Sequence, residues 1–236
     1  MVFGVSLVVP CYNEETIIEK SVLKIQKVFE KKGYNYEILL IDDKSKDFTK
    51  QIIQRLSKTN PRIKSMFHSQ NQGRGQTVKD GINVSKHNIV GFIDIDLEIA
   101  AEYLPKAIEQ IQKGFDVCIG VRHYQRGLRT LHRAILSKGY SFMSRAILNL
   151  PLKDTESGLK FFNKKTTMKI LKETQNKHWF WDTEIMALAY YSGLKISEID
   201  VIFEKNYESP STVNIFSDSF DYFNELIKFR KRIKKK

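Results

Sequence analysis

Residues 5–15 read VSLVVPCYNEE, an apolar run that ends abruptly in polar side chains. Such a short run, rich in Val and Leu, is typical of a strand buried on both faces of a parallel sheet. Residues 16–31 then space their apolar side chains at helical intervals, and the alternation continues along the chain. We expect strands at 5–9, 37–41, 63–67, 89–93 and 117–121, and helices at 16–31, 48–56, 75–85 and 104–113. This order predicts right-handed crossovers and an α/β fold, a doubly wound, mostly parallel sheet with helices on both faces.

Length and composition indicate one domain and an anionic partner. The chain has 236 residues, of which 42% are hydrophobic, enough to bury a full core. Its formal net charge is +12. Nucleic acid, acidic lipid and a phosphorylated substrate all suit such a charge, so the charge by itself does not choose among them.

The cysteines and the absence of a long apolar stretch bear on location. Cys11 and Cys118 lie in apolar surroundings without the CxxC spacing of a metal or redox pair, so we expect buried thiols in a reducing compartment. No stretch approaches the ~20 apolar residues that span a bilayer, and no basic leader precedes residues 5–9. We therefore expect a soluble or peripheral protein.

The polar segments that follow the expected strands are the chemically informative ones, because ligands of a doubly wound sheet bind beyond the carboxyl ends of its strands. They read PCYNEE at 10–15, DDKSKD at 42–47, NQGRG at 71–75 and DIDLE at 94–98. The glycines of NQGRG do not form a Walker motif, since no Lys-Ser/Thr pair follows them. They suit a tight turn or a close approach of the backbone to a ligand.

Acidic residues gather at two neighbouring strand ends. Asp94 and Asp96 flank one apolar residue, so alternation predicts that both side chains lie on the same side, and Asp42 and Asp43 end the adjacent strand. Such a cluster calls for a cation, and carboxylate oxygens select Mg²⁺ or Mn²⁺. A divalent ion with open positions is a usual way to bind a substrate diphosphate. The alternative for residues 42–47 is a solvated turn that caps the next helix through Asp47.

Six segments carry a resemblance to a known family: VVPCYNEE, LLIDDKSKDFT, NQGRGQTVKDGI, FIDIDLE, GVRH and DTESGLKFF. In this order they resemble glycosyltransferase family 2, specifically its polyprenyl-phosphate mannose and glucose synthases. The resemblance extends from residue 5 to residue 203. It implies a GT-A fold with a Rossmann-like nucleotide-binding half, a GDP- or UDP-sugar donor, a divalent cation, and inversion at the anomeric carbon.

The resemblance also implies roles for individual residues. The nucleotide-sugar site is expected to contain Pro10, Tyr12, Asn13, Glu14, Asp42, Asp43, Gly73 and Asp94. The metal site is expected to contain the DxD acids Asp94 and Asp96, with Glu98 at a variable third position. The acceptor phosphate is expected to contact Arg122, Arg133, Ser157 and Lys205, with Asp154 and Gly158 in the same turn as Ser157. Lys205 stands where many relatives carry an arginine, in a segment that departs from the family pattern.

The expected catalytic groups depend on the acceptor. A phosphate monoester is anionic at pH 7 and attacks without a general base, so Asp94, Asp96, Arg122 and Arg133 would act by holding and neutralising the reactants. An alcohol acceptor would need a base, for which Asp182 and Glu184 in FWDTE at 180–184 are the candidates. The alternatives are that Asp182 caps the following helix, that the arginines are surface charges, and that Lys160 is structural or solvated.

Two basic amphipathic stretches suggest membrane contact. Residues 128–150 mix apolar side chains with His132, Arg133, Lys138 and Arg145, and residues 216–236 form a second such segment with a basic end. We expect a catalytic domain at 1–215 and an amphipathic tail at 216–236. The expected location is cytoplasmic, peripheral on the cytoplasmic face of a membrane, with an anionic leaflet and a separate membrane protein as partners. A core-packing helix and a solvated charged end are the alternatives.

The predicted function is transfer of a hexose from a nucleotide-diphosphate sugar, of GDP-mannose or UDP-glucose type, to a polyprenyl phosphate lipid such as dolichyl phosphate. A first alternative keeps the family and changes the acceptor to a saccharide hydroxyl. A remote alternative is a basic nucleic-acid-binding protein, but no RRM, KH or helix-turn-helix pattern is present and the acidic DID segment would be unexplained. We therefore expect no nucleic-acid partner.

Overall fold

The computed structural model describes residues 3–124, 131–206 and 215–234, with the backbone alone at 131–138, 140 and 215–220. Its strands are β1 (Gly4–Cys11), β2 (Asn35–Asp42), β3 (Ile63–Phe67), β4 (Ile89–Ile93), β5 (Val117–Tyr124), β6 (Leu159–Asn163) and β7 (Ile196–Phe203). Its helices are α1 (Ile18–Lys31), α2 (Thr49–Thr59), α3 (Arg74–Val84), α4 (Leu104–Gln112), α5 (Leu131–Leu148), α6 (Lys164–Glu173), α7 (Trp181–Tyr191) and α8 (Ile215–Ile233), with a 3₁₀ turn at Ala101–Tyr103.

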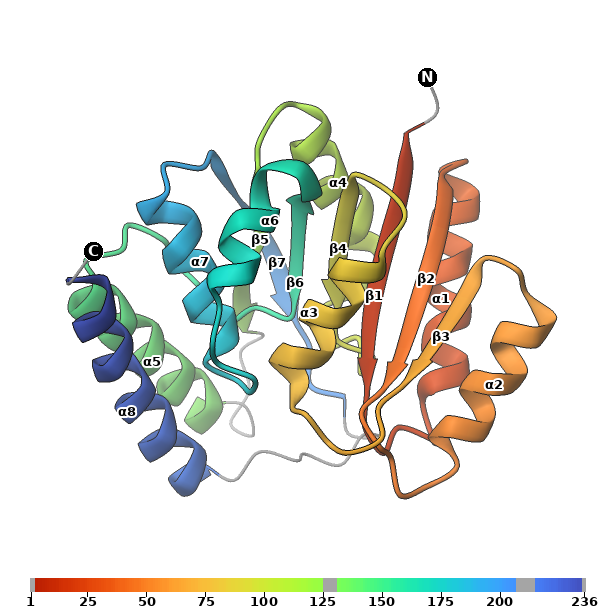
Figure 1. The fold of residues 1–236 in the computed structure, drawn as a ribbon, viewed down its shortest axis with the longest axis horizontal. Coiled ribbons are helices and arrows are strands. Elements are labelled where there is room, and N and C mark those ends of the chain that lie inside the picture. Colours follow the sequence, from red (N-terminus) through yellow and green to blue (C-terminus); the bar gives the residue numbers. More distant parts are fainter. Residues whose placement is uncertain (1–2, 125–130, 207–214, 235–236) are drawn as a thin grey trace.

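The described strands form one sheet in the order β3-β2-β1-β4-β6-β5-β7 (Figure 1). β1 pairs in parallel with β2 and β4, β2 pairs in parallel with β3, and β5 pairs in parallel with β7. β6 is antiparallel to both of its neighbours, β4 and β5. The predicted doubly wound, mostly parallel sheet is confirmed, and the antiparallel β6 is an addition that the sequence did not predict.

Helices cover both faces of the sheet because each strand is apolar on both sides. Val5, Leu7 and Val9 of β1 belong to the core cluster that includes residues of α1, α2 and α4. Val8 points to the opposite face, into the cluster that includes residues of α3, α6 and α7. Figure 1 shows α3, α6 and α7 in front of the sheet and α1 and α4 behind it. The five strands and four helices expected from the sequence are all present at their predicted places.

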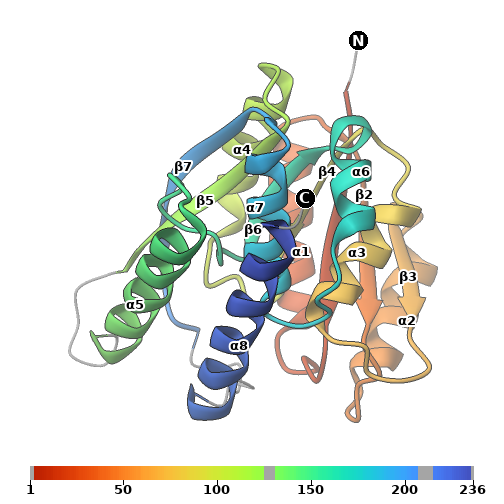
Figure 2. The same cartoon turned by 60° about the vertical axis from the view of Figure 1, so that its left-hand side comes forward.

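Helices α5 and α8 lie side by side near the carboxyl ends of the parallel strands in both views (Figures 1 and 2). Tyr222, Leu226 and Phe229 of α8 are buried in the same core cluster as α7. The buried Tyr222 hydroxyl lies 2.8 Å from Ser144 Oγ of α5 and 2.6 Å from Thr183 Oγ1 of α7. The core-packing alternative therefore holds for one side of each helix, while the boundary at residue 215 and the membrane contact stay predictions.

The predicted burial of both cysteines is confirmed, and the reducing compartment stays a prediction. Cys11 and Cys118 are both buried and unpaired, and burial raises the pKa of the Cys11 thiol above its usual range and that of Cys118 to about 12. Among the described helices, none has the length and apolar character that crossing a membrane requires.

The packing of α8 can be tested with substitutions of one fully buried and one partly exposed side chain. Leu226 has no exposed surface, so Leu226→Ala should lower the free energy of unfolding by about 2–5 kcal/mol. Phe223 is 41% exposed, and Phe223→Ala should cost only about 0.5–1 kcal/mol. Urea denaturation followed by circular dichroism measures both. Equal small losses would mean that α8 does not pack on the domain in solution.

Candidate active site

The polar segments that follow β1 and β2 hold one another in place. Asn13 adopts a φ of 58°, which Asn tolerates better than most residues. Its backbone N–H donates to Ser45 Oγ at 2.9 Å, and its Oδ1 accepts from Lys46 N at 2.7 Å. The Glu14 N–H donates to Thr49 Oγ1 at 2.7 Å. The predicted nucleotide-binding residues of β1 thus lie in a braced turn, with Pro10 and Tyr12 half-buried beside it.

Asp42 and Asp43 both organise loops. Asp42 is buried, and its Oδ1 accepts from Ser45 N at 3.2 Å. Asp43 accepts from the backbone N–H groups of Gln72 and Gly73, each at 2.8 Å, and lies 2.7 Å from His68 Nδ1. Asp43 therefore builds the turn that leads into α3, and contact between these two acids and a donor nucleotide stays a prediction.

Gly73 is needed in this turn for two reasons. Its φ of +93° is unfavourable for residues with a side chain, and an added Cβ would lie 2.5 Å from the carbonyl oxygen of Lys177. The loop before α7 thus packs directly on the N-terminus of α3. Local packing is therefore sufficient to explain Gly73, and contact with a ligand is not required to account for it.

Asp94 is bonded to a side chain that the sequence analysis did not consider. Its Oδ1 accepts from Arg74 Nε at 2.8 Å and lies 2.7 Å from Arg74 Nη2. On the other side, Oδ2 faces Gly158 so closely that a Cβ there would lie 2.0 Å from it. Burial raises the pKa of Asp94, while Arg74 opposes that shift. Asp94 is thus fixed between a guanidinium and a glycine.

Behind Arg74 lies a second, fully enclosed ion pair. Asp182 Oδ1 accepts from Lys160 Nζ at 2.6 Å, and Asp182 Oδ2 accepts from Arg74 Nη1. The Lys160 side chain is 0% exposed and that of Asp182 is 3% exposed. Asp182 lies in the first turn of α7, whose N-cap is Phe180, so the interpretation of Asp182 as the N-cap is wrong. Lys160 was predicted to be either structural or solvated, and because it is buried only the structural role fits.

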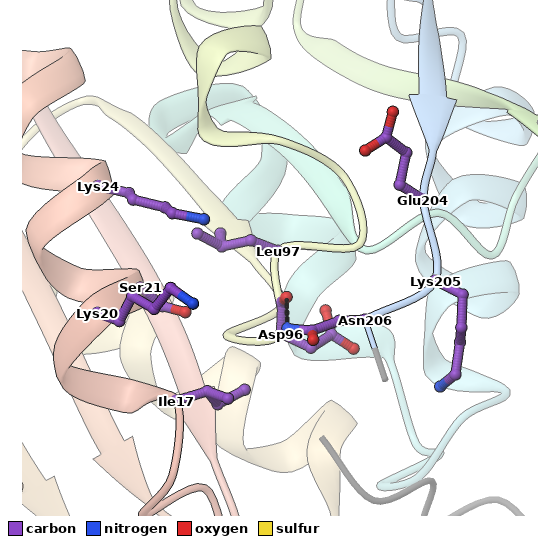
Figure 3. Close-up of a pocket in the computed structure, with 9 residues that line it drawn as sticks. All are labelled: Ile17, Lys20, Ser21, Lys24, Asp96, Leu97, Glu204, Lys205 and Asn206. Atoms are coloured by element: carbon purple, nitrogen blue, oxygen red, sulfur yellow. Dashed lines mark hydrogen bonds between the residues drawn. The ribbon is translucent and has the colours of Figure 1, made fainter. Parts of the chain in front are cut away.

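Asp96 has different surroundings because β4 ends at Ile93 and the chain then turns, with Leu97 at a φ of 51°. Asp96 lines a cavity of about 220 Å³ between α1 and the segment after β7. Figure 3 shows Lys20 and Ser21 of α1 on one side of Asp96 and Asn206 close to it on the other. Burial, Asp94 and Glu98 raise the pKa of Asp96 to about 7. The two acids are therefore close neighbours with separate partners.

The predicted third metal-site residue and the predicted phosphate-binding lysine contact each other. Lys205 Nζ lies 3.0 Å from Glu98 Oε1, and both side chains are largely buried. The backbone N–H of Asn206 donates to the same oxygen at 3.3 Å. This contact ties the segment after β7 to the DIDLE turn, and the separate ligand roles of Glu98 and Lys205 stay predictions.

The carboxylates at this edge of the sheet suit a divalent ion whose coordination shell is completed by oxygens of the substrate. In the part of the chain that the structure describes, no group of three or more His, Cys, Asp or Glu side chains could hold a metal. Asp94 is already neutralised by Arg74, and Glu98 by Lys205. Asp96 is buried beside the acids Asp94 and Glu98, and a bound cation would stabilise the negative charge of its carboxylate. One carboxylate plus diphosphate oxygens is a common arrangement for Mg²⁺.

Arg122 is anchored by the turn that precedes β6. Its Nε and Nη2 donate to Asp154 at 2.7 and 2.9 Å, and Nη2 also donates to Glu156 at 3.4 Å. Burial raises the pKa of the Glu156 carboxyl to about 7, although Arg122 opposes that shift. Ser157 is buried, and its Oγ accepts from Leu159 N at 3.4 Å. The Arg133 side chain lies outside the described residues, so its predicted contact with phosphate cannot be placed beside Arg122.

Arg74 was not among the site residues predicted from the sequence, and Lys160 was predicted to be structural or solvated. A signal for Arg74 was present, because it stands between two glycines at a strand-to-helix turn where polar side chains meet the ligand edge. No comparable signal marks Lys160, which stands among the apolar residues of β6. Its partner, Asp182, comes 22 residues later in the sequence. Such a pair depends on packing between β6 and α7, which sequence spacing does not encode.

A mostly parallel, doubly wound α/β sheet with acids at the carboxyl ends of its strands defines a class of protein that binds its ligand at that edge. Residues 6–171 match the family model described as glycosyl transferase family 2, and the chain belongs to that family. The resemblance to glycosyltransferase family 2 that the six sequence motifs carry is thereby confirmed.

Two curated relatives indicate the part of the family to which the chain is similar. It is 30% identical to a dolichyl-phosphate beta-glucosyltransferase, ALG5A, of Trichomonas vaginalis, over 83% of this chain and 64% of that protein. It is 32% identical to a dolichol-phosphate mannosyltransferase of Pyrococcus furiosus, over 65% of this chain and 44% of that protein. The chain therefore spans less than two thirds of the length of either relative.

A solved structure shows the same fold. Glucosyl-3-phosphoglycerate synthase from Mycobacterium tuberculosis, in complex with Mn²⁺, UDP-glucose and phosphoglyceric acid, superposes with a TM-score of 0.72 at 16% identity. The match covers 97% of this chain and 80% of that one. The predicted GT-A fold is therefore confirmed.

The close contact between Gly158 and Asp94 generates a prediction. Gly158→Ala should displace the Asp94 carboxylate, because the added Cβ would overlap Oδ2. A displacement of about 1 Å in a substrate-positioning group costs about a hundredfold in rate, so kcat/KM for the donor should fall by about that factor. Gly139→Ala is the control, since a Cβ there has nothing within 4 Å. Equal rates for both variants would show that the position of Asp94 does not matter.

Proposed function

We propose that the chain transfers a hexose, with inversion, from a nucleotide-diphosphate sugar to a polyprenyl phosphate. The observation that carries this proposal is the set of polar groups at the carboxyl edge of the sheet, where Asp94 and Asp96 have different partners and Arg122, near the end of β5, is anchored by Asp154. The relatives named for dolichyl-phosphate glucosyl transfer and dolichol-phosphate mannosyl transfer support the choice of lipid phosphate.

The donor side of the proposal rests on the braced turns after β1 and β2 and on the cavity beside Asp96. The expected donor is of the GDP-mannose or UDP-glucose type, with the base near Pro10 and Tyr12. A bound Mg²⁺ or Mn²⁺ would be held by Asp96 and would neutralise charge on the diphosphate as it leaves. The mycobacterial neighbour with the same fold was crystallised with Mn²⁺ and UDP-glucose, which supports a divalent ion here.

The acceptor side of the proposal rests on the contacts of the two candidate bases. The Asp182 side chain is only 3% exposed and each of its oxygens accepts from a cation, which makes it a poor base for a substrate hydroxyl. Glu184 is buried and accepts from Gln175 N and Asn176 N, at 3.0 and 2.8 Å, as well as from Arg232. A phosphate acceptor needs no base, so the geometry favours it over an alcohol.

Arg122 remains the candidate for the acceptor phosphate. Asp154 holds Nε and Nη2, whereas Nη1 makes no hydrogen bond to the part of the chain that the structure describes. A guanidinium anchored through one edge presents its remaining N–H groups in a fixed direction, which suits recognition of phosphate. Ser157, Arg133 and Lys205 keep their expected roles in this proposal.

Location at an anionic membrane surface is part of the same proposal. Phe142 of α5 is 71% exposed and Phe223 of α8 is 41% exposed, and the exposed Arg145 and Lys228 lie on the same two helices. Aromatic side chains with basic neighbours suit a lipid headgroup region. We place the protein on the cytoplasmic face, where an acceptor lipid would be within reach.

The acceptor can be identified by where a labelled sugar goes. With GDP-[¹⁴C]mannose or UDP-[¹⁴C]glucose and dolichyl or undecaprenyl phosphate, we expect label to enter the organic phase after extraction. Label that stays in water on a saccharide, with none in the lipid, would replace the proposed acceptor by a sugar hydroxyl. Omitting the lipid is the matched control for donor hydrolysis.

Metal dependence is tested separately from acceptor identity. Excess EDTA should abolish transfer, Mn²⁺ should restore it, and Asp96→Asn should lower kcat/KM by about a hundredfold or more because one charge-stabilising ligand is lost. Asp200→Asn serves as the control, since Asp200 of β7 is an exposed acid paired with His123 of β5. Full transfer in EDTA would rule out a catalytic ion.

A further inference from the structure

Asp94, Arg74, Asp182 and Lys160 form, in this order, a chain of alternating charges that runs inward from the partly exposed Asp94. Asp94 is 34% exposed and faces the site, Arg74 is 12% exposed behind it, and Asp182 and Lys160 are enclosed. Their four formal charges cancel. Each link comes from a different element, since Asp94 follows β4, Arg74 begins α3, Asp182 lies in α7 and Lys160 lies in β6.

The Arg74 guanidinium is confined on its faces as well as its edges. It lies over the ring of Phe92, 5.2 Å from the centroid, and over the ring of Trp179 at 5.4 Å. Its N–H groups reach one carboxylate on each side, Asp94 and Asp182. A planar group that contacts two rings and two carboxylates has little rotational freedom, so its position sets that of Asp94.

Asp182 is in turn fixed by Lys160. Lys160 Nζ donates to Asp182 Oδ1 at 2.6 Å and to the carbonyl oxygen of Ser157 at 2.7 Å. Removing one partner of a buried ion pair leaves an uncompensated charge, which is strongly unfavourable. Without Lys160, Asp182 would have Arg74 as its remaining ion-pair partner, and Arg74 would be drawn away from Asp94.

We propose that Asp182 is a positioning residue, which with Lys160 holds Arg74 and thereby orients the Asp94 carboxylate toward a nucleotide-diphosphate donor. The inference rests on the proposed function only in taking the donor to carry a nucleoside diphosphate, and it is independent of the acceptor. It assigns to Asp182 a role in donor binding, in place of proton abstraction from an acceptor. It also makes the geometry of the donor site depend on β6 and α7, which follow the strands β1, β2 and β4 that carry the predicted donor-binding residues.

The test compares two buried carboxylates of the same helix turn. Asp182→Asn keeps the shape and removes the charge that holds Arg74, whereas Glu184→Gln alters a carboxylate that holds Gln175, Asn176 and Arg232 and does not contact Arg74. Binding of Mn²⁺ with UDP, and of Mn²⁺ with GDP, is measured by calorimetry in the absence of any acceptor. Asp182→Asn should weaken binding of the preferred nucleotide by about tenfold or more, the scale of one lost charged hydrogen bond. Glu184→Gln should lower the melting temperature and change affinity by less than about twofold.

Two further variants and one further readout keep the test decisive. Lys160→Met should reproduce the effect of Asp182→Asn, and Arg74→Lys should be intermediate because a lysine keeps the charge but not the fork. Quenching of tryptophan fluorescence by acrylamide needs no nucleotide and reports Trp179, since Trp181 is fully buried. Quenching should increase in Asp182→Asn, whose Arg74 is released from Trp179, and stay unchanged in Glu184→Gln.

The outcomes separate this inference from the proposed function. If Asp182→Asn binds nucleotide and is quenched as the wild type, yet loses turnover by about a hundredfold or more, Asp182 is a general base and the inference is overturned. Equal losses in Asp182→Asn and Glu184→Gln would also overturn it, because they would reflect general destabilisation. Failure of transfer to a polyprenyl phosphate, with the nucleotide-binding differences intact, would instead contradict the proposed acceptor alone.

Discussion

The burial of two cations, Arg74 and Lys160, beside the acids Asp94 and Asp182 is the constraint on which the site depends. A charged group is costly to remove from water unless partners replace the lost hydration, so these four side chains must lie together or not be buried at all. Satisfying that requirement brings the start of α3, the end of β4, β6 and the first turn of α7 to one place. The antiparallel β6 is what makes this possible, because it carries Lys160 between the two parallel parts of the sheet.

The same principle distributes charge along the carboxyl edge of the sheet. Arg74 neutralises Asp94, Lys205 neutralises Glu98, and Asp154 occupies one edge of Arg122. The site therefore does not present a bare cluster of acids that needs a metal to exist. Asp96 differs from these acids, because burial and its acidic neighbours raise its pKa. A preorganised arrangement of this kind places charges in fixed positions before the reactants arrive, which is the main source of electrostatic catalysis.

Helices α5 and α8 lie side by side near the carboxyl ends of the parallel strands (Figures 1 and 2). Each has a side that packs on the core, shown by Ser144 and Leu226, and each also carries an exposed aromatic residue, Phe142 on α5 and Phe223 on α8. Tyr222 joins α8 to α5 and α7 through its hydroxyl. A surface contact made by these helices would thus act on elements that are continuous with the catalytic core, rather than on a detached tail.

The sequence by itself determined the fold class, the places of the first five strands and the family. Local periodicity decides strands and helices, and the motif order from VVPCYNEE to DTESGLKFF lies in continuous segments. It also identified the acids at the strand ends, because the carboxyl edge of a parallel sheet collects whatever follows each strand. Only the tertiary structure decided which charges pair: that Asp43 builds the turn before α3, that Arg74 lies between Asp94 and Asp182, and that Lys160 is buried. These partners are between 20 and 108 residues apart, and ion pairs across elements follow from packing geometry, on which short-range sequence patterns carry no information.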